Sequence, residues 1–540
     1  MDRKACLFVL VTSMAAGLAG LAACVGDEPS LTATSTPDGD GGGGTDGPVT
    51  SDGPTSGNEA GTDASDAAVD PCAVTTGAFL ASKTFPFVGT NHGVVGTSNG
   101  GYVFAGDFRS NNGSITYGDA GPISGSGNTM DAAVVRFNPD GSLKWQAHFG
   151  GTNSETFQGV TVDDKDDVYV AGYFASPAFT IGTSFSNPSQ ANLGIVAKLD
   201  GATGAPLWAH SFAPGYFGYG CSAIDFDSGR LVVSCSMGTT QTYDKGPGGM
   251  TAVLQGAQPA GAAVYGLDPA NGYVLWGLGF GATTPDNSTA TNVYSIDVTP
   301  AGTVVAGVFS GGTFTAKQTT AITVAQIGTK PNGFVTELSA SATAALPLWA
   351  KGFGDATSAG EVYSVSAAGT SKTGIVVGGS FQGQIDFGGG PHASVGGLDA
   401  FAMMLLNKAG PPAWEKFFGG AMSDTIGRVR FDACGRAEVL MLAHSALPVT
   451  DGVTIPAPQA AGEAAIMAKL EPAAGKLLWA SGVTPGGSAD LTGINNYDFG
   501  IDTRGNTLVV GDFRGTIDFG SGTPSTAVGG SDPFVLGYGP

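Results

Sequence analysis

Six tryptophans are spaced almost evenly along the chain, and this spacing limits the possible fold more than any other feature. Successive tryptophans are 63 to 73 residues apart, at Trp145, Trp208, Trp276, Trp349, Trp414 and Trp479. Around each one the same pattern recurs: an apolar strand ending in an acid or Asn, a turn, the Trp, and a second apolar strand. Self-similarity at a fixed period is typical of repeat proteins, whose units bury their apolar faces against neighbouring units.

Each repeat contains four predicted strands. Short apolar runs are separated by Gly, Asp and Asn turns, and no stretch of helical period competes with them. In the first repeat we expect strands near 92–97, 101–108, 131–138 and 142–149, and five further repeats follow in the same order. Four short antiparallel strands per repeat form one blade of a propeller.

The seventh repeat shows only three strands, near 497–502, 507–513 and 532–538. A spare strand, Ser82–Phe87, precedes the first repeat. Placed as the outermost strand of the seventh blade, it would close the ring and remove both exposed sheet edges. The predicted fold is therefore an all-β, seven-bladed β-propeller of four-stranded antiparallel blades over residues 71–540, closed by an N-terminal strand in the last blade.

Three segments resemble the SBBP-type repeats of bacterial seven-bladed propellers, which are common in surface and secreted proteins. They are FGGTNSETFQGVTVDDKDDVYVAGYF at 149–174, GSFQGQIDFGGG at 379–390 and GDFRGTIDFGSG at 511–522. The resemblance extends over nearly all of residues 79–540. It implies an architecture, and it implies no general catalytic chemistry.

The N-terminus predicts export and a lipid anchor. Arg3 and Lys4 precede an apolar run from Leu7 to Ala23, which is typical of a signal peptide over residues 1–23. Leu21-Ala22-Ala23-Cys24 resembles the lipobox of bacterial lipoproteins, which implies that Cys24 becomes the lipidated first residue of the mature protein. We therefore expect a protein anchored in the cell envelope, at the outer membrane or the cell surface, that contacts the membrane only through its lipid.

Residues 24–70 are predicted to be a disordered acidic tether. Residues 25–70 are rich in Gly, Ser, Thr and Pro and hold ten acids but no Lys or Arg, so they cannot bury enough apolar surface to order. As a flexible coil this segment would span about 35–40 Å. The whole chain has a formal net charge of −22 and remains acidic without the tether, which argues against nucleic-acid binding.

Two motifs hint at enzymatic chemistry, and each has a structural explanation. AKLDGATGAPLWAHSF at 197–212 is similar to the motif that locks neighbouring blades in pyrroloquinoline-quinone dehydrogenases, but the chain lacks their adjacent cysteine pair. Gly96-Thr97-Ser98-Asn99-Gly100 matches the letters of a nucleophile elbow, yet it joins two strands and is predicted to be a hairpin turn. We therefore expect no cofactor and name no catalytic residue. The five histidines form no short-range ligand pair: His92, His148, His210, His392 and His444.

A set of acids closes several innermost strands. Such an Asp commonly starts a turn by accepting hydrogen bonds from backbone amides two residues on. Arranged in a ring, the acids would also point towards one mouth of the channel and be candidates for holding a cation. The acids are Asp163, Asp227, Asp432 and Asp502, with Thr299 at the equivalent place in the fourth blade.

Four cysteines remain after the signal peptide and the lipidated residue. Cys221 and Cys235 flank a hairpin centred on Ser228, so they should face each other across two strands and form a disulfide in an oxidising compartment. Cys72 and Cys434 are the second pair, and a bridge between them would fasten the closing strand. Free thiols remain the alternative for both pairs, because sequence alone does not determine pairing.

Long connections between the second and third strands define a candidate binding face. They span about 109–130, 175–193, 237–260, 310–331, 382–398, 444–462 and 514–531. Loops on a rigid scaffold commonly carry function. On the same face, Tyr216, Phe217 and Tyr219 are candidate ligand-binding residues, since stacked aromatics suit sugars or peptides; the alternative is that they cover the junction of two blades.

The leading functional hypothesis is a monomeric, lipid-anchored envelope propeller that acts as a non-catalytic binding or scaffold protein for a glycan, peptide or protein. The alternative is an envelope enzyme, whether quinoprotein-like, a hydrolase or a lyase, with an active site at the channel mouth. Spacing in the sequence does not separate the two, because such residues meet only when the ring closes.

Overall fold

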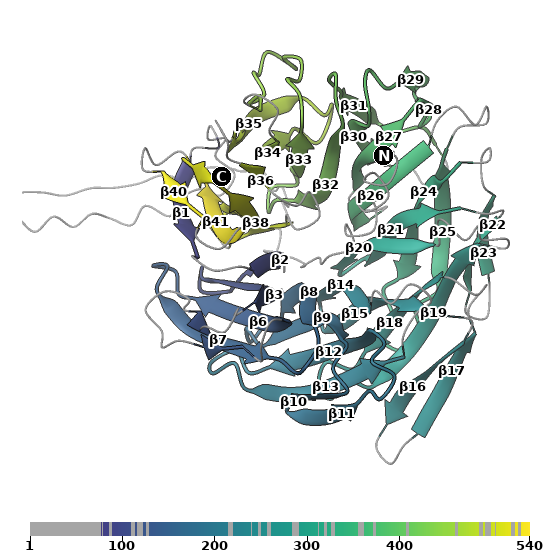
Figure 1. The fold of residues 1–540 in the computed structure, drawn as a ribbon. Helices are drawn as coiled ribbons and strands as arrows, with labels where there is room; N and C mark the ends of the chain where they lie inside the picture. Colours follow the sequence, from purple (N-terminus) through teal and green to yellow (C-terminus); the bar gives the residue numbers. More distant parts are fainter. Residues whose placement is uncertain are drawn as a thin grey trace, which may run out of the picture. The chain divides into compact units, whose positions relative to one another are not determined.

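The described part of the chain is built almost entirely of short antiparallel strands. In this computed structural model the innermost strands of seven sheets are arranged around a common axis, and the region about this axis is called here the channel (Figure 1). No described helix has the length and hydropathy needed to cross a membrane. The structure describes residues 77, 79–85, 89–109, 114–115, 123–125, 129–213, 220–238, 240–246, 250–255, 261–282, 291–310, 313–317, 321–325, 330–354, 361–370, 374–406, 410–458, 463–484, 490–491, 498–502, 504–519, 524–527 and 531–539.

Each of the first six blades is a meander of four antiparallel strands, which confirms the predicted repeat. From the channel outwards, blade 1 contains β2 (Gly89–Gly96), β3 (Tyr102–Arg109), β6 (Met130–Phe137) and β7 (Leu143–Phe149); blade 2 contains β8 (Glu155–Val162), β9 (Val168–Phe174), β12 (Leu193–Leu199) and β13 (Pro206–Phe212); blade 3 contains β14 (Cys221–Asp227), β15 (Arg230–Met237), β18 (Gly261–Leu267) and β19 (Val274–Ala282). Blade 4 contains β20 (Asn292–Thr299), β21 (Gly302–Phe309), β24 (Asn332–Ser339) and β25 (Pro347–Phe353); blade 5 contains β26 (Glu361–Thr370), β27 (Gly374–Gln382), β30 (Asp399–Leu405) and β31 (Trp414–Phe418); blade 6 contains β32 (Asp424–Phe431), β33 (Ala437–Ala443), β34 (Ala464–Leu470) and β35 (Leu477–Val483).

Blade 7 is assembled from both ends of the described chain. It contains β37 (Asp498–Ile501), β38 (Thr507–Arg514), β41 (Asp532–Tyr538) and, outermost, β1 (Phe79–Thr84), with the short β36 (Asp490–Leu491) also paired to β38. Figure 1 shows the purple β1 among the yellow C-terminal strands. The predicted closure is confirmed, but the strand begins and ends about three residues earlier than expected. Phe85 is already buried between blades 7 and 1 and lies outside the strand.

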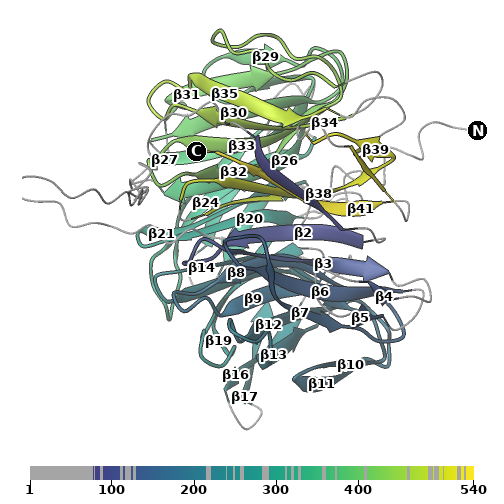
Figure 2. The same ribbon diagram turned by 90° about the vertical axis from the view of Figure 1, so that its left-hand side faces the viewer.

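The long connections of six blades contain small hairpins that the sequence analysis did not predict. Five of these hairpins form separate two-stranded sheets, and β4, β5 and β39 lie on the same side of the ring (Figure 2). The hairpins are β4 (Ser114–Ile115) with β5 (Ile123–Ser124), β10 (Ala178–Ile181) with β11 (Thr183–Ser186), β16 (Thr240–Gly246) with β17 (Met250–Gln255), β22 (Thr313–Lys317) with β23 (Ala321–Ala325), β28 (Gln384–Asp386) with β29 (Pro391–Ala393), and β39 (Thr516–Ile517) with β40 (Ser525–Thr526).

The alternating strands define two faces of the ring. The turns between first and second strands and between third and fourth strands lie on one face, called here the turn face. The long connections and the links between successive blades lie on the other, the long-loop face.

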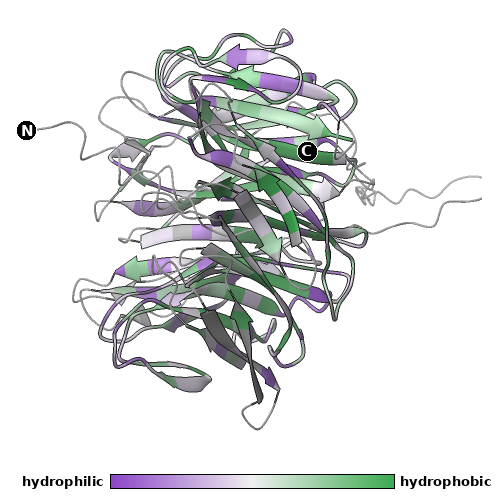
Figure 3. Cartoon of the chain, turned by 90° about the vertical axis from the view of Figure 1, so that its right-hand side faces the viewer, coloured by the Kyte–Doolittle hydropathy of each residue, from purple (hydrophilic) through white to green (hydrophobic). Residues whose placement is uncertain are grey.

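The hydrophobic core is divided into seven clusters, one at each seam between neighbouring blades. At the seam of blades 1 and 2, for example, Val134 and Trp145 pack with Phe157 and Ile195. Apolar residues recur along the strands of the blades, as Figure 3 shows. Each blade therefore depends on both neighbours to bury its apolar faces, which is why the repeat must close on itself or expose two of its faces.

The repeated tryptophans fasten four of these seams. The Trp145 indole donates from Nε1 to the carbonyl of Gly201 in the next blade, at 3.0 Å, and its ring lies against Gly204, which has a φ of +75°. Trp208 and Trp414 dock in the same way on Gly272 and Gly475. At the seam of blades 6 and 7, Trp479 lies against Gly77, just before the closing strand. The segment at 197–212 thus has a blade-joining role in this chain.

Candidate functional site

The channel wall carries charged side chains that the sequence analysis did not single out. Each lies on an innermost strand, where an acid or an arginine interrupts an apolar run such as SAIDFD or IGRVRF. Four of the five are nearly inaccessible, with at most 5% of their surface exposed, whereas Asp297 is only partly buried. The five residues are Asp225 on blade 3, Asp297 on blade 4, Arg428 and Arg430 on blade 6, and Asp498 on blade 7.

The three aspartates each bind the backbone of the next blade. A carboxylate oxygen of Asp225 accepts from the amide of Val298 at 2.6 Å, and one of Asp297 accepts from Gly369 at 2.6 Å. The Asp498 carboxylate is 3.4 Å from the amide nitrogen of Val94, across the closing seam. These carboxylates therefore connect the innermost strand of one blade to the innermost strand of the next, which belongs to a separate sheet.

The two arginines link blade 6 to blade 7. Arg430 donates from Nε to the carbonyl of Phe499 at 2.5 Å and from a terminal nitrogen to Asp498 at 3.1 Å. Arg428 approaches the same carboxylate, with 3.4 Å between Nε and Oδ1. A buried carboxylate held by two guanidinium groups is strongly destabilised if one partner is removed.

Among the acids of the channel, Asp297 has a pKa that suits proton transfer near neutral pH. Burial raises its pKa to about 6, while the amide of Gly369 and the charge of Arg430 oppose the rise. Burial and the neighbouring Asp297 also raise the pKa of Asp225 well above its usual range. Because Asp297 is the more accessible of the two, it is the better candidate for exchanging a proton with a bound molecule.

A second polar cluster joins blades 1 and 2. His92 Nε2 lies 2.9 Å from Oδ2 of Asp107, and the Thr156 hydroxyl donates to the same oxygen at 2.8 Å. Tyr173 lies nearby, and burial followed by repulsion from Asp107 and Glu155 raises its pKa to about 12. An imidazole oriented by a buried carboxylate is a common arrangement for a general base.

The acids that close innermost strands act as turn residues. Asp163 accepts from the amides of Lys165 and Asp167, at 3.0 and 2.9 Å, and Asp432 and Asp502 repeat this pattern. Their second oxygens face side-chain cations, for example Lys198 at 2.9 Å from Asp163. Asp227 differs, because it precedes a two-residue hairpin turn and its Oδ2 has no described partner. In the described part of the chain, no three His, Cys, Asp or Glu side chains are grouped so that they could hold a metal ion.

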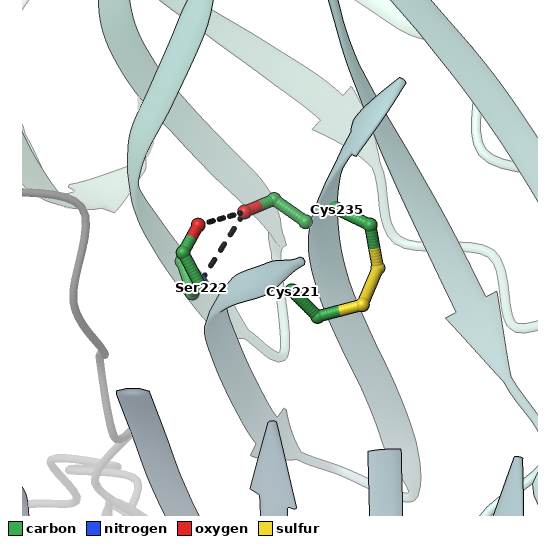
Figure 4. The surroundings of a disulfide bond; sticks show 5 residues. Cys221, Ser222 and Cys235 are labelled. Carbon is green, nitrogen blue, oxygen red and sulfur yellow. Dashed lines mark hydrogen bonds between the residues drawn. A yellow bond between two sulfur atoms is a disulfide. The ribbon is translucent and has the colours of Figure 1, made fainter. Parts of the chain in front are cut away.

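The predicted disulfide between Cys221 and Cys235 is confirmed. The two residues are opposed in register on β14 and β15, and their sulfurs are 2.08 Å apart. Figure 4 shows Ser222 beside the bond, and its hydroxyl lies 3.2 Å from that of Ser234. Cys434 is also disulfide-bonded, but Cys72 lies outside the described residues, so the pairing of these two stays a prediction.

The remaining candidates have structural positions or lie outside the described residues. The segment from Gly96 to Gly100 forms the hairpin turn between β2 and β3, as predicted. His210 and His444 contact backbone carbonyls, and His392 stacks on Phe417 with 3.6 Å between ring centres. The aromatic candidates Tyr216, Phe217 and Tyr219 lie outside the described residues, as does Cys24.

Comparison with known proteins yields similarity of fold only. No protein-family model and no curated protein matches the sequence. Quinohemoprotein alcohol dehydrogenase from Comamonas testosteroni aligns with a TM-score of 0.37 and 10% identity, over 85% of this chain and 76% of that one. The corresponding enzyme ADHIIG from Pseudomonas putida HK5 gives 0.31 and 10%, over 80% and 67%. BamB from Moraxella catarrhalis gives 0.29 and 12%, over 67% and 94%.

Proposed function

We propose that this protein is an exported, lipid-anchored propeller of the SBBP repeat type that binds or scaffolds other molecules at the cell envelope and is not a catalyst. The observation that carries the proposal is the use made of the channel charges. Asp225, Arg430 and Asp498 are at most 4% exposed, and each is bound across a seam between blades. Side chains used in this way stabilise the ring and are not free to act on a substrate.

The binding surface in this proposal is the long-loop face. Repeated connections on a rigid ring present many variable side chains at low ordering cost, which suits recognition of an extended glycan, peptide or protein. The acidic tether would hold the propeller at an average distance of about 35–40 Å from the membrane while leaving it free to rotate.

The anchor is tested by labelling cells with a fatty-acid analogue. The full-length chain should incorporate label, and Cys24→Ser should abolish incorporation. Cys6→Ser is the matched control, because Cys6 lies within the proposed signal peptide and its replacement should leave labelling intact. Labelling that survives Cys24→Ser would reject the anchor without affecting the proposed binding role.

Binding is tested with the intact lipoprotein in detergent on glycan and peptide arrays. We expect retained ligands to be recovered chemically unchanged after prolonged incubation. Ligand turnover by the purified protein would contradict the non-catalytic role.

The alternative function is an envelope enzyme with its active site at the channel mouth. Two observations favour it: the contact between His92 and Asp107, and the raised pKa of the partly exposed Asp297. If turnover is found, His92→Gln and Asp297→Asn should each reduce kcat, and Lys165→Gln, on an exposed turn, should not. An activity that neither the His92 nor the Asp297 substitution reduces would reject this location.

A further inference from the structure

The seam between blades 3 and 4 is fastened differently from the others. At the six other seams, a side chain of the outermost strand contacts the segment before the next blade's outermost strand. The contacts come from Trp145, Trp208, Trp414 and Trp479, from Lys351 on blade 4, which donates to the carbonyl of Gly410 at 2.6 Å, and from Lys83 on β1, which donates to Gly141 at 2.8 Å.

Trp276 shares a core cluster with Ala345 of blade 4, but the described structure shows neither a hydrogen bond from its indole to that blade nor a glycine of that blade against its ring. The indole nitrogen of Trp276 lies against Gly266 of its own blade, which leaves no room for a Cβ there. The turn that should receive the ring, residues 340–346 of blade 4, has no glycine at all. A cavity of about 10 Å³, with room for about one water molecule, is lined by Trp276 together with Ser341 and Ala342 of this turn.

A hairpin of blade 4 holds the opposite end of the same seam. β22 pairs antiparallel with the end of β19 in blade 3, so that Gly279 to Ala282 face Lys317 to Phe314. Blade 3 thereby belongs to a six-stranded sheet, whereas the other described hairpins do not extend a blade (Figure 1). Ala316 is fully buried in the core of this seam, and Val324 of β23 packs against the same cluster.

The two ends of the seam are therefore held by different means. β19 runs from the turn face, where the cavity lies, to the long-loop face, where β22 is attached. Between the ends, Arg230 reaches from blade 3 to the carbonyl of Thr299, and Asp225 accepts from Val298. The apolar core is present, but the turn-face end lacks the tryptophan–glycine or lysine–carbonyl contact that is described at the other six seams.

We propose that β22–β23 is a strap that replaces tryptophan docking at this seam, and that the ring opens there, at the turn-face end, more readily than at any other seam. Partial opening between blades 3 and 4 would widen the channel next to Asp297, the accessible acid of its wall. This opening of the seam does not depend on which ligand the long-loop face binds.

The test removes the strap from the full-length protein. Residues 313–325 are replaced by a short Gly-Ser linker, and amide hydrogen exchange is followed by mass spectrometry. The matched control removes 240–255, the β16–β17 hairpin, which also places one buried and one partly buried apolar side chain on its seam but pairs with no blade strand. We expect exchange in β19 and β20 to rise at least about tenfold without the strap, and β13 and β14 to change less in the control.

Two further variants keep the proposal open to refutation if the strapless chain does not fold. Gly281→Cys with Thr315→Cys, at opposed positions, should cross-link the strap and slow exchange at the seam only under oxidising conditions. Replacing residues 340–346 with the glycine-bearing turn 471–476 should restore docking of Trp276 and lessen the effect of strap removal. Equal exchange at the seams of blades 2–3 and 3–4 in all variants would overturn the proposal.

Discussion

At the scale of single residues, a glycine in the receiving turn decides whether a tryptophan can join two blades. Gly272 and Gly475 have positive φ angles, which L side chains rarely adopt, and a Cβ on either would come within 2.5 Å of indole carbons. The turn therefore needs glycine for two reasons at once, its backbone conformation and the closeness of the ring.

Comparing Gly475→Ala with Gly141→Ala should separate the cost of the strained backbone from the cost of the overlap with the indole ring. Both glycines have positive φ, at +64° and +77°, but a Cβ on Gly475 meets Trp414 at 2.4 Å and one on Gly141 meets nothing within 4 Å. We expect Gly141→Ala to lower the free energy of unfolding by about 1–2 kcal/mol, and Gly475→Ala by about 1–3 kcal/mol more through overpacking. Denaturant titrations give both values, and equal losses would show that the ring contact contributes nothing.

Asp297 predicts a distinctive pH dependence. Its folded pKa of about 6 lies above the unfolded value, so its contribution to stability is complete below about pH 4 and is lost as pH rises to about 6. At pH 8 the free energy of unfolding of Asp297→Asn should therefore exceed that of the wild type by about 1 kcal/mol, which thermal unfolding shows as a higher melting temperature. At pH 4 the variant should show no such gain.

Asp163→Asn is the control of opposite sign. Burial opposes ionisation of Asp163, but the bond to Lys198 and the turn amides outweigh it and lower its pKa. Its contribution is present above the unfolded pKa and lost as pH falls, so this variant should lose stability at pH 8. Parallel pH profiles for the two variants would contradict the assignment of these shifts.

At the scale of elements, the β14–β15 hairpin is reinforced at both of its ends. A disulfide joins its ends, and a positive-φ pair, Ser228 and Gly229, makes its turn. Replacing both Cys221 and Cys235 by Ser should lower the free energy of unfolding by about 2–3 kcal/mol, as expected for a short closed loop. A guanidinium titration under oxidising conditions measures the loss. Under reducing conditions, which also break the disulfide of Cys434, the variant and the wild type should unfold alike.

The sequence predicted the elements well because their signal is repeated. Seven copies of the same alternation of strands and turns identified the blades, and the symmetric spacing of Cys221 and Cys235 about Ser228 identified the disulfide. The channel charges were missed because one acid inside an apolar strand, such as Asp225, reads as an irregularity until closure shows the backbone amide it meets. The strap was missed because pairing of β22 with another blade leaves no local pattern.

At the scale of the whole molecule, stability depends on closure. Seven seam clusters bury the blade faces, and the ring has no free end only because β1 pairs with β41. Lys83 of β1 adds a link to blade 1, since its ammonium group lies 4.3 Å from the centre of the Phe137 ring and donates to Gly141. Six residues from the start of the described ring therefore join its last blade to its first.

Deleting residues 79–84 should open the ring, while deleting 30–60 within the predicted tether should leave it folded. Without β1, the edge of β41 is exposed and the seams of blade 7 with both neighbours lose support, so we expect a lower melting temperature and association through the free edge. A synthetic peptide spanning residues 77–85 should restore both the melting temperature and the monomeric elution volume. If the chain lacking β1 melts and elutes like the one lacking 30–60, closure by this strand is not what holds the propeller together.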